Sequence, residues 1–275
     1  MLDRDRIRAM VQRALDEDLP DLTSEAVFKP SDRGSAVFVV KAPGVLAGLE
    51  FAEETFLQLD PASIFKAGVA DGALVEPGQI VAEVASSVVA LLSGERTALN
   101  FLQRASGISS ATRRYVDAVT GTKAKIYDTR KTAPGLRYLD KHAVAAGGGQ
   151  NHRFGLFDMF LVKNNHIDRA GSIGAAVERI RAGGGTQKIM VEVRDPGELD
   201  EALAVQPDLI LLDNMSPAQM RAAVERTAGR VPLEASGGIT LESVRVVAET
   251  GVDRISVGAL THSVRAMDIS MRIRS

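Results

Sequence analysis

The sequence predicts an α/β protein whose two halves differ in rhythm. Over roughly residues 1–107, short apolar stretches such as "SAVFVVKAPGVLAGLE" are broken by glycine, which is typical of strands and turns. From about residue 123, strand-like and helix-like segments alternate in about six units. This alternation indicates a parallel sheet with helices outside it. Six units are near what a closed barrel requires, and a doubly wound open sheet is the alternative.

The first half is predicted to mix helices with its strands. Residues 4–15 are predicted to form an amphipathic helix, because Ile7, Met10, Val11, Ala14 and Leu15 share one face. A second helix is expected at "FAEETFLQL" and a third at "ERTALNFLQRASG". Residues 1–107 therefore indicate an α+β domain.

Each unit of the second half begins with a short apolar segment. The predicted strands are "AKIYD", "MFLVKN", "KIMVEV", "DLILLD", "VPLEAS" and "RISVG". Helices are expected between them, for example over "LRYLDKHAVAAGGG" and "GSIGAAVERIRAGGG". Asp195-Pro196 with Glu198, and Ser216-Pro217 with Gln219, fit a helix cap, a first-turn proline and a capping-box partner.

Composition excludes several classes of function. The 275 residues are 45% hydrophobic and 25% charged with a net charge of −2, so no global basic field points to nucleic acid. The absence of cysteine excludes disulfides, thiol catalysis and thiolate metal sites. The charged N-terminus is unlike a signal peptide, and no apolar run approaches the ~20 residues of a membrane helix. A cytoplasmic protein without membrane or nucleic-acid partners is expected.

Polar residues recur where the predicted strands end. Asp128, Lys163, Glu192, Asp213 and Ser236 end or directly follow five of the strands. A single strand-end charge is usually solvated at the rim. Five in succession favour a ligand site, because the carboxyl ends of parallel strands meet at one edge.

The basic residues of this edge point to an anionic ligand. Arg130, Lys131, His152, Arg153 and Lys163 lie on consecutive strand-end segments, where an anion would offset their repulsion. The acids of the later strands are suited to sugar hydroxyls or a divalent cation. The glycines of "EASGGIT" and "SVGAL" allow close approach of a phosphate to the backbone.

The longest motifs resemble the quinolinate phosphoribosyltransferase family. They are "DTRKTAPGLRYLDKHAVAAGGGQNHRFGL", "LVKNNHI", "LLDNM", "EASGGIT", "SVGALTHS" and, in the first half, "SGERTALNFLQRASGI". The resemblance covers nearly the whole chain. It implies that quinolinate and phosphoribosyl pyrophosphate, with Mg²⁺, give nicotinate mononucleotide, pyrophosphate and CO₂ in de novo NAD synthesis.

The resemblance also implies a fold and an assembly. An N-terminal α/β sandwich domain over residues 1–107 would be joined by the C-terminal segment 265–275. An incomplete seven-stranded α/β barrel would cover residues 108–264. A homodimer, or a multiple of dimers, would share active sites across its interface.

The resemblance assigns roles to individual residues. Arg96 corresponds to an arginine lent to the neighbouring subunit's quinolinate site. The quinolinate carboxylates would be bound by Arg130, His152 and Arg153, with Thr129 beside them, and Lys131 and Lys163 would lie between quinolinate and the phosphates. The ribose hydroxyls and the metal would be held by Glu192 and Asp213. The 5′-phosphate would be bound by Ser236, Gly237, Gly238, Val257, Gly258 and Ala259. Lys131, Lys163, Glu192 and Asp213 form the expected catalytic group, and Lys131 or a water would protonate the ring after decarboxylation.

Two positions depart from the family pattern. Asn164 and Met190 each place a neutral side chain, at or near the rim of the site, where the family usually has a carboxylate, which bears on metal affinity and turnover. Three alternatives stay open: a related barrel family associated with molybdenum transport genes, an aldolase-like lyase with Lys163 or Lys131 as Schiff base, and a non-catalytic anion-binding relative.

Overall fold

The computed structural model describes residues 3–274, so Met1, Leu2 and Ser275, the outermost residues of the predicted first domain, lie outside it. The chain divides into two units. The first comprises residues 1–113, 133–148 and 264–275, and the second comprises residues 114–132 and 149–263.

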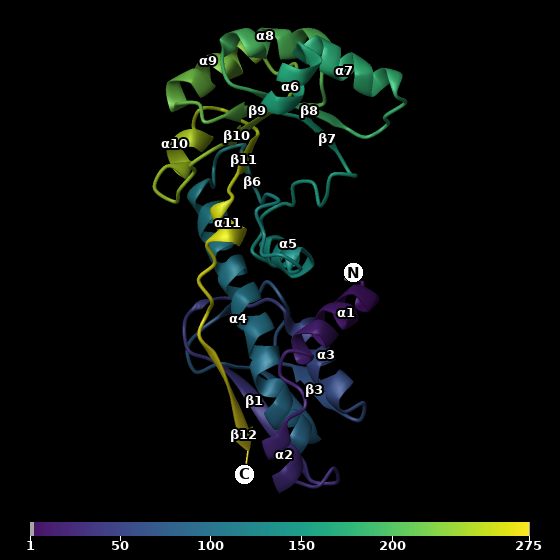
Figure 1. The fold of residues 1–275 in the computed structure, drawn as a ribbon. Coiled ribbons are helices and arrows are strands. Elements are labelled where there is room, and N and C mark those ends of the chain that lie inside the picture. Colours follow the sequence, from purple (N-terminus) through teal and green to yellow (C-terminus); the bar gives the residue numbers. More distant parts are fainter. Residues whose placement is uncertain (1–2, 275) are drawn as a thin grey trace. The chain divides into compact units, whose positions relative to one another are not determined.

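An antiparallel sheet organises the first unit (Figure 1). Its strand order is β12-β1-β5-β3, so the last strand of the chain pairs with the first. Phe38 and Val40 of β1 pack against Phe56, Leu91 and Leu102 of the neighbouring helices in the core. The strands of the unit are β1 (Arg33–Val40), β2 (Gly44–Val45), β3 (Ile64–Ala67), β4 (Leu74–Val75), β5 (Ile80–Ser87) and β12 (Ile269–Arg274).

The predicted first helix is confirmed. The Asp3 carboxylate accepts hydrogen bonds from the N–H groups of Asp5 and Arg6 and so caps α1, whose face of Ile7, Met10, Val11 and Leu15 is buried. The helices that lie wholly in this unit are α1 (Arg4–Leu15), α2 (Leu22–Val27), α3 (Leu49–Leu59) and α5 (Arg137–Ala146).

Helix α4 (Val88–Ala118) runs without interruption through residue 107, where the sequence analysis placed a domain boundary. Residues 133–148, which that analysis assigned to the barrel, group with the first unit. The physical reason lies in α5. Arg104 of α4 donates to both oxygens of the fully buried Asp140 at 2.8 and 2.9 Å, and His142 lies 2.6 Å from Asp71.

A parallel sheet forms the second unit, with strand order β6-β11-β10-β9-β8-β7. The family resemblance implied a seventh strand. Within residues 3–274 the chain instead makes an isolated parallel bridge from Gln150 to Tyr127, on the free side of β6. The strands are β6 (Lys125–Tyr127), β7 (Phe160–Val162), β8 (Ile189–Val193), β9 (Leu209–Asp213), β10 (Leu233–Ser236) and β11 (Arg254–Ser256).

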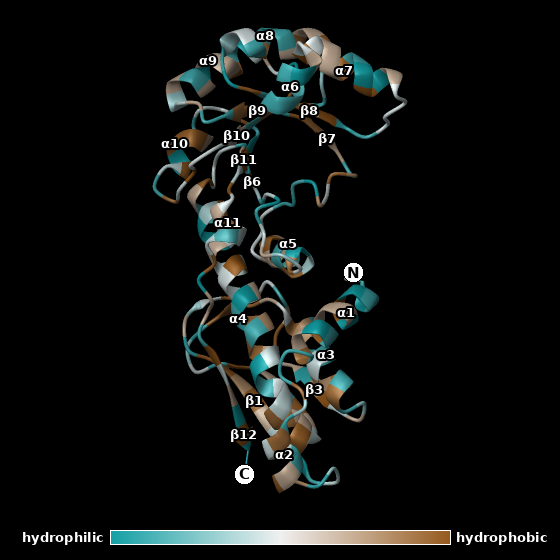
Figure 2. Ribbon diagram, in the orientation of Figure 1, coloured by the Kyte–Doolittle hydropathy of each residue, from teal (hydrophilic) through white to brown (hydrophobic). Residues whose placement is uncertain are grey.

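Helices α7, α8 and α9 cover the outer face of this sheet (Figure 1), and the strands beneath them are apolar (Figure 2). Ser216 forms the predicted capping box with Gln219. Asp195 is the predicted cap, but Glu198 accepts from the Arg194 N–H instead of from the cap itself. The helices are α6 (Asn164–Ala170), α7 (Ile173–Ala182), α8 (Pro196–Val205), α9 (Pro217–Thr227), α10 (Val244–Ala248) and α11 (Ala259–His262). No helix in the described part of the chain has the length and apolarity to cross a bilayer.

Candidate active site

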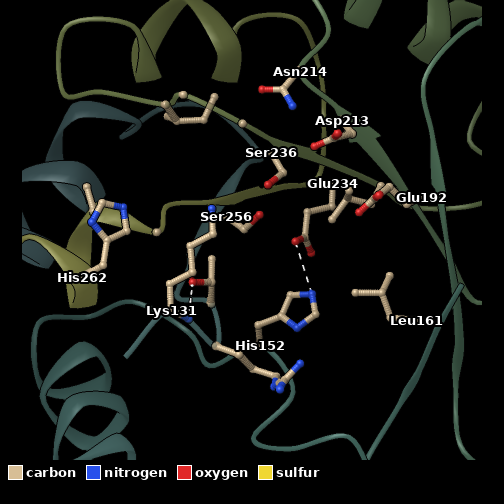
Figure 3. A pocket seen from close by; sticks show the side chains of 18 of the residues that line it. Lys131, His152, Leu161, Glu192, Asp213, Asn214, Glu234, Ser236, Ser256 and His262 are labelled. Carbon is tan, nitrogen blue, oxygen red and sulfur yellow. Dashed lines mark hydrogen bonds and ion pairs between the residues drawn. The ribbon is translucent and has the colours of Figure 1, made fainter. Parts of the chain in front are cut away.

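A pocket of about 680 Å³ opens at the carboxyl ends of the strands in the second unit. This volume is within the usual range for small-molecule sites. Most residues that the sequence pointed to lie along its wall, namely Thr129, Arg130, Lys131, His152, Arg153, Lys163, Glu192, Asp213, Ser236, Gly237, Gly238, Gly258 and Ala259. Leu161, Leu211, Asn214, Glu234, Ile239, Thr240, Ser256 and His262 complete the lining (Figure 3).

The "DTRK" segment is held in place by local hydrogen bonds. The Lys131 N–H donates to the Thr129 hydroxyl at 3.0 Å, and the Lys131 carbonyl accepts from the Thr261 hydroxyl at 2.8 Å. The carboxylate of Asp128 is fully buried and accepts from the His152 N–H at 2.8 Å. Asp128 therefore ties the "NHR" loop to the end of β6, and its role is structural.

Two arginines stand together in this wall. Arg153 is anchored through Nη1, which donates to the Met159 carbonyl at 3.1 Å. Burial, together with the like charge of Arg130, lowers the pKa of Arg153, while Asp158 opposes the shift. Two close guanidinium groups in a partly buried wall are stabilised by an anion bound between them.

His152 has the hydrogen bonding of a neutral imidazole. Its Nδ1 accepts from the Arg153 N–H at 2.7 Å and therefore carries no proton. The proton of the neutral ring is then on Nε2, which lies 3.4 Å from Oε1 of Glu234. From the sequence, His152 is expected to be one of the basic groups. In this geometry it adds a polar donor, and the fixed positive charge comes from the arginines and lysines.

Glu234 is the pocket residue that the sequence analysis missed. It lies on β10, is fully buried, and points toward His152 (Figure 3). Burial raises the pKa of Glu234 to about 7, although the Ser256 hydroxyl and the Arg254 charge act to lower it. A charge inside the apolar "VPLEAS" strand, two residues before Ser236 and so on the same face, is the signal that could have revealed it.

The two predicted acids stand on adjacent strands. Glu192 of β8 is mostly buried and pairs with Lys163, whose Nζ lies 2.9 Å from Oε2. Asp213 ends β9 and pairs in register with Ser236 of β10. In the described residues, no group of three or more His, Cys, Asp or Glu side chains could hold a metal. These two carboxylates would hold Mg²⁺ only together with ligand oxygens, which is how proteins commonly bind this ion.

The residues of the two glycine-bearing loops differ in backbone conformation and in their position relative to the pocket wall. Gly237 has φ +99°, and a Cβ there would lie 2.1 Å from Oδ1 of Asn214. Only glycine fits such a position. Val257 is buried, and its N–H donates to the Tyr127 carbonyl at 2.9 Å, so the structure places it behind the wall. Arg96 is exposed on α4 in the first unit and does not line this pocket.

Asn164 and Met190, the two departures from the family pattern, are not among the residues that line the pocket. Met190 is fully buried in a small apolar cluster with Leu209 and Leu211, so the expectation that it lies at the rim is wrong. A methionine is stable there because its neighbours are apolar. Asn164 begins α6 and is half-buried.

Comparisons with known proteins agree with this architecture. Residues 21–106 match the family model "Quinolinate phosphoribosyl transferase, N-terminal domain", and residues 108–272 match the model of the C-terminal domain. The chain is 44% identical over 277 residues to "Nicotinate-nucleotide pyrophosphorylase [carboxylating]" of Mycobacterium leprae, covering 97% of both chains. It is 40% identical over 289 residues to "Quinolinate phosphoribosyltransferase [decarboxylating] 2a, mitochondrial" of Nicotiana tabacum, covering 97% of this chain and 82% of the relative.

The fold also matches solved structures. NadC from Streptococcus pyogenes superposes with a TM-score of 0.95 at 38% identity, over 100% of this chain and 98% of that one. The nicotinate-nucleotide pyrophosphorylase from Francisella tularensis gives a TM-score of 0.95 at 36% identity, over 100% and 98% of the two chains.

Proposed function

Because this chain belongs to the quinolinate phosphoribosyltransferase family, we propose that it forms nicotinate mononucleotide from quinolinate and phosphoribosyl pyrophosphate, with release of pyrophosphate and CO₂, in NAD synthesis. The observation that carries the proposal is one pocket lined by two neighbouring arginines, two lysines, two strand-end carboxylates and a glycine loop. Such a pocket accommodates a dicarboxylate beside a phosphorylated sugar.

The cations have first to bring two anions together. Arg130 and Arg153 bind the carboxylates of quinolinate with Thr129 beside them, since a guanidinium pairs with a carboxylate through two N–H groups. Lys131 and Lys163 lie between quinolinate and the phosphates. Holding the pyridine nitrogen at the anomeric carbon supplies proximity, a contribution of up to ~7–11 kcal/mol in favourable cases.

The charges that develop on the substrates then determine how the bonds form and break. The ring nitrogen bonds to the anomeric carbon as the bond to pyrophosphate breaks, and the cationic ribose is offset by Glu192 and Asp213. The alkylated nitrogen is positive, so it stabilises the electron pair left on the adjacent carbon when CO₂ departs. A proton then replaces the lost carboxylate. No protein nucleophile is required.

Mg²⁺ belongs to the proposal through the two acids. Glu192 and Asp213 stand on neighbouring strand ends in the pocket and would hold the ion together with oxygens of phosphoribosyl pyrophosphate. When bound, the ion would offset the negative charge of the leaving pyrophosphate. Ser236, Gly237, Gly238, Gly258 and Ala259 would receive the 5′-phosphate.

The assembly and location are part of the same proposal. A homodimer, or a multiple of dimers, places Arg96 of one subunit at the quinolinate site of the other. The exposed position of Arg96 on α4 leaves its side chain accessible for such a role. A cytoplasmic location is the expectation from the sequence.

The lyase alternative is disfavoured for Lys163 by one contact. The Lys163 ammonium is held 2.9 Å from the Glu192 carboxylate, whereas a Schiff base requires a free amine. Borohydride treatment with a carbonyl substrate tests Lys163 and Lys131 together, and it should leave the mass of the protein unchanged.

The proposed reaction is tested directly with purified protein, Mg²⁺, phosphoribosyl pyrophosphate and quinolinate labelled in the carboxylate that is lost. Labelled CO₂ should appear in a one-to-one ratio with nicotinate mononucleotide, and only when both substrates are present. A folded protein that releases no CO₂ would instead support the non-catalytic anion-binding alternative.

A further inference from the structure

Glu234 is an unusual group for an anion pocket. It lines the same cavity as Arg130 and Arg153, and it is fully buried on β10. Neither carboxylate oxygen has a hydrogen bond of ordinary length within residues 3–274. Nε2 of His152 lies 3.4 Å from Oε1. A buried carboxyl without ordinary partners costs free energy unless it is neutral or a ligand completes its bonding.

His152 lies beside this carboxyl. Its Nδ1 accepts from the Arg153 N–H at 2.7 Å, so the ring proton is on Nε2, which lies 3.4 Å from Oε1 of Glu234 without the geometry of a hydrogen bond. A neutral Glu234 therefore keeps one oxygen that can accept a hydrogen bond and one that can donate.

We propose that Glu234 is a further substrate-binding residue which, in its neutral form, donates a hydrogen bond from Oε2 to a carboxylate of quinolinate. The inference rests on the proposed function and deepens it. Quinolinate binding is then coupled to protonation, because an ionised Glu234 would place a third carboxylate beside two of the substrate.

The surroundings of Glu234 are consistent with a carboxyl that is easily protonated. Burial and the charge of Asp128 favour the neutral form, whereas Arg254 and Ser256 favour the ionised form, and its pKa is about 7. The other titratable or charged groups that face it or share its cavity are Tyr127, Arg130, Lys131, His152, Arg153, Lys163, Glu192, Asp213 and His262. The alternative is a permanently ionised Glu234 whose negative charge only offsets the positive charges of Arg130 and Arg153.

Glu234→Gln separates these readings, because an amide reproduces both the acceptor and the donor of the neutral acid but cannot ionise. We would measure kcat/KM for quinolinate from pH 6 to 8.5, which reports ionisations of the free enzyme. The wild-type value should fall about 30-fold by pH 8.5, as expected for one group with a pKa of about 7. The Gln variant should lose this fall, because its amide cannot ionise.

Two controls accompany the measurement. Glu249→Gln removes the same charge from an exposed ion pair on α10 and should retain the wild-type profile. Wild-type protein alone gives a test that needs no variant at Glu234. Calorimetry of quinolinate binding at pH 7.5, in two buffers of different ionisation enthalpy, should show uptake of about three-quarters of a proton.

Each other outcome overturns the proposal. An equal fall in wild type and Glu234→Gln would assign the ionisation to another group. A folded Gln variant with activity reduced more than tenfold at every pH would mean that the charge or the proton of Glu234 is itself required. A flat wild-type profile, or binding without proton uptake, would leave no coupled protonation. If wild type releases no CO₂ from quinolinate at all, the proposed function fails instead, and the two failures are distinguishable.

Discussion

Replacement of Gly237 by alanine tests whether the "SGG" loop binds the phosphate. Its φ of +99° lies outside the region that alanine readily adopts, which costs on the order of 1–3 kcal/mol. The new Cβ would lie 2.1 Å from Oδ1 and 3.0 Å from the backbone N of Asn214. That backbone N–H is bonded to the Ser236 carbonyl at 2.9 Å, so the loop cannot yield without breaking this bond or moving.

A displacement of about 1 Å is needed to restore an ordinary contact, and a misplacement of this size can lower a rate about 100-fold. We expect kcat/KM for phosphoribosyl pyrophosphate to fall by about 10- to 100-fold, with a smaller change for quinolinate. Steady-state kinetics with each substrate varied in turn make the comparison. Gly229→Ala is the matched control, since Gly229 has φ +73° and nothing within 4 Å of an added Cβ. It should lower stability slightly and leave the kinetics unchanged. A folded Gly237→Ala enzyme with wild-type kinetics for phosphoribosyl pyrophosphate would refute the phosphate role of this loop.

Three further predictions concern single residues. Arg130→Lys turns a planar fork into a point charge, so kcat/KM for quinolinate should fall ~10-fold or more, about 1.4 kcal/mol; near-normal kinetics would make Arg130 a solvated rim residue. Mixing Arg96→Ala with Lys163→Ala subunits, each inactive alone, should restore about one quarter of wild-type activity in a two-fold dimer with shared sites, and no recovery in verified mixed dimers would show that Arg96 serves its own subunit. The pKa of Glu234 rises from 4.5 to about 7 on folding, so its neutral form stabilises the fold fully at low pH, and stability should decline by about 3 kcal/mol as pH rises from 4.5 through 7. Denaturant unfolding at pH 5 and pH 8 measures the decline, and Glu234→Gln should reduce it.

The alternating half of the fold is predictable from sequence because its signals are local. Apolar strands such as "DLILLD" are short and bounded, and the Ser216–Gln219 capping box forms as the pattern predicts. Polar strand ends converge because parallel strands share one edge, which brings Arg130, Lys163 and Asp213 into one pocket. These inferences need only periodicity and topology.

Features of the fold that depend on long-range contacts could not be predicted from the sequence. Nothing local marks α4 as one helix of 31 residues, since two glycines and several serines interrupt its helical pattern. The grouping of α5 with the first unit depends on the Arg104–Asp140 pair, which joins residues 36 positions apart. The proximity of His152 to Glu234 brings together residues from two distant segments of the chain. Such facts follow from tertiary geometry alone.

Substrate choice tests the central claim most directly. The pocket wall of Arg130 and Arg153, with Glu234 in the neutral form proposed above, offers more donors than one carboxylate can satisfy. An acid lacking the second carboxylate would leave a partly buried guanidinium without its partner, and a site built to pair such a group rejects that acid by a factor on the order of 10⁴. Nucleotide formation should therefore be measured with quinolinate and with nicotinate at equal concentration, each with phosphoribosyl pyrophosphate and Mg²⁺. We expect turnover of quinolinate and almost none of nicotinate, whereas efficient use of nicotinate without use of quinolinate would contradict the account.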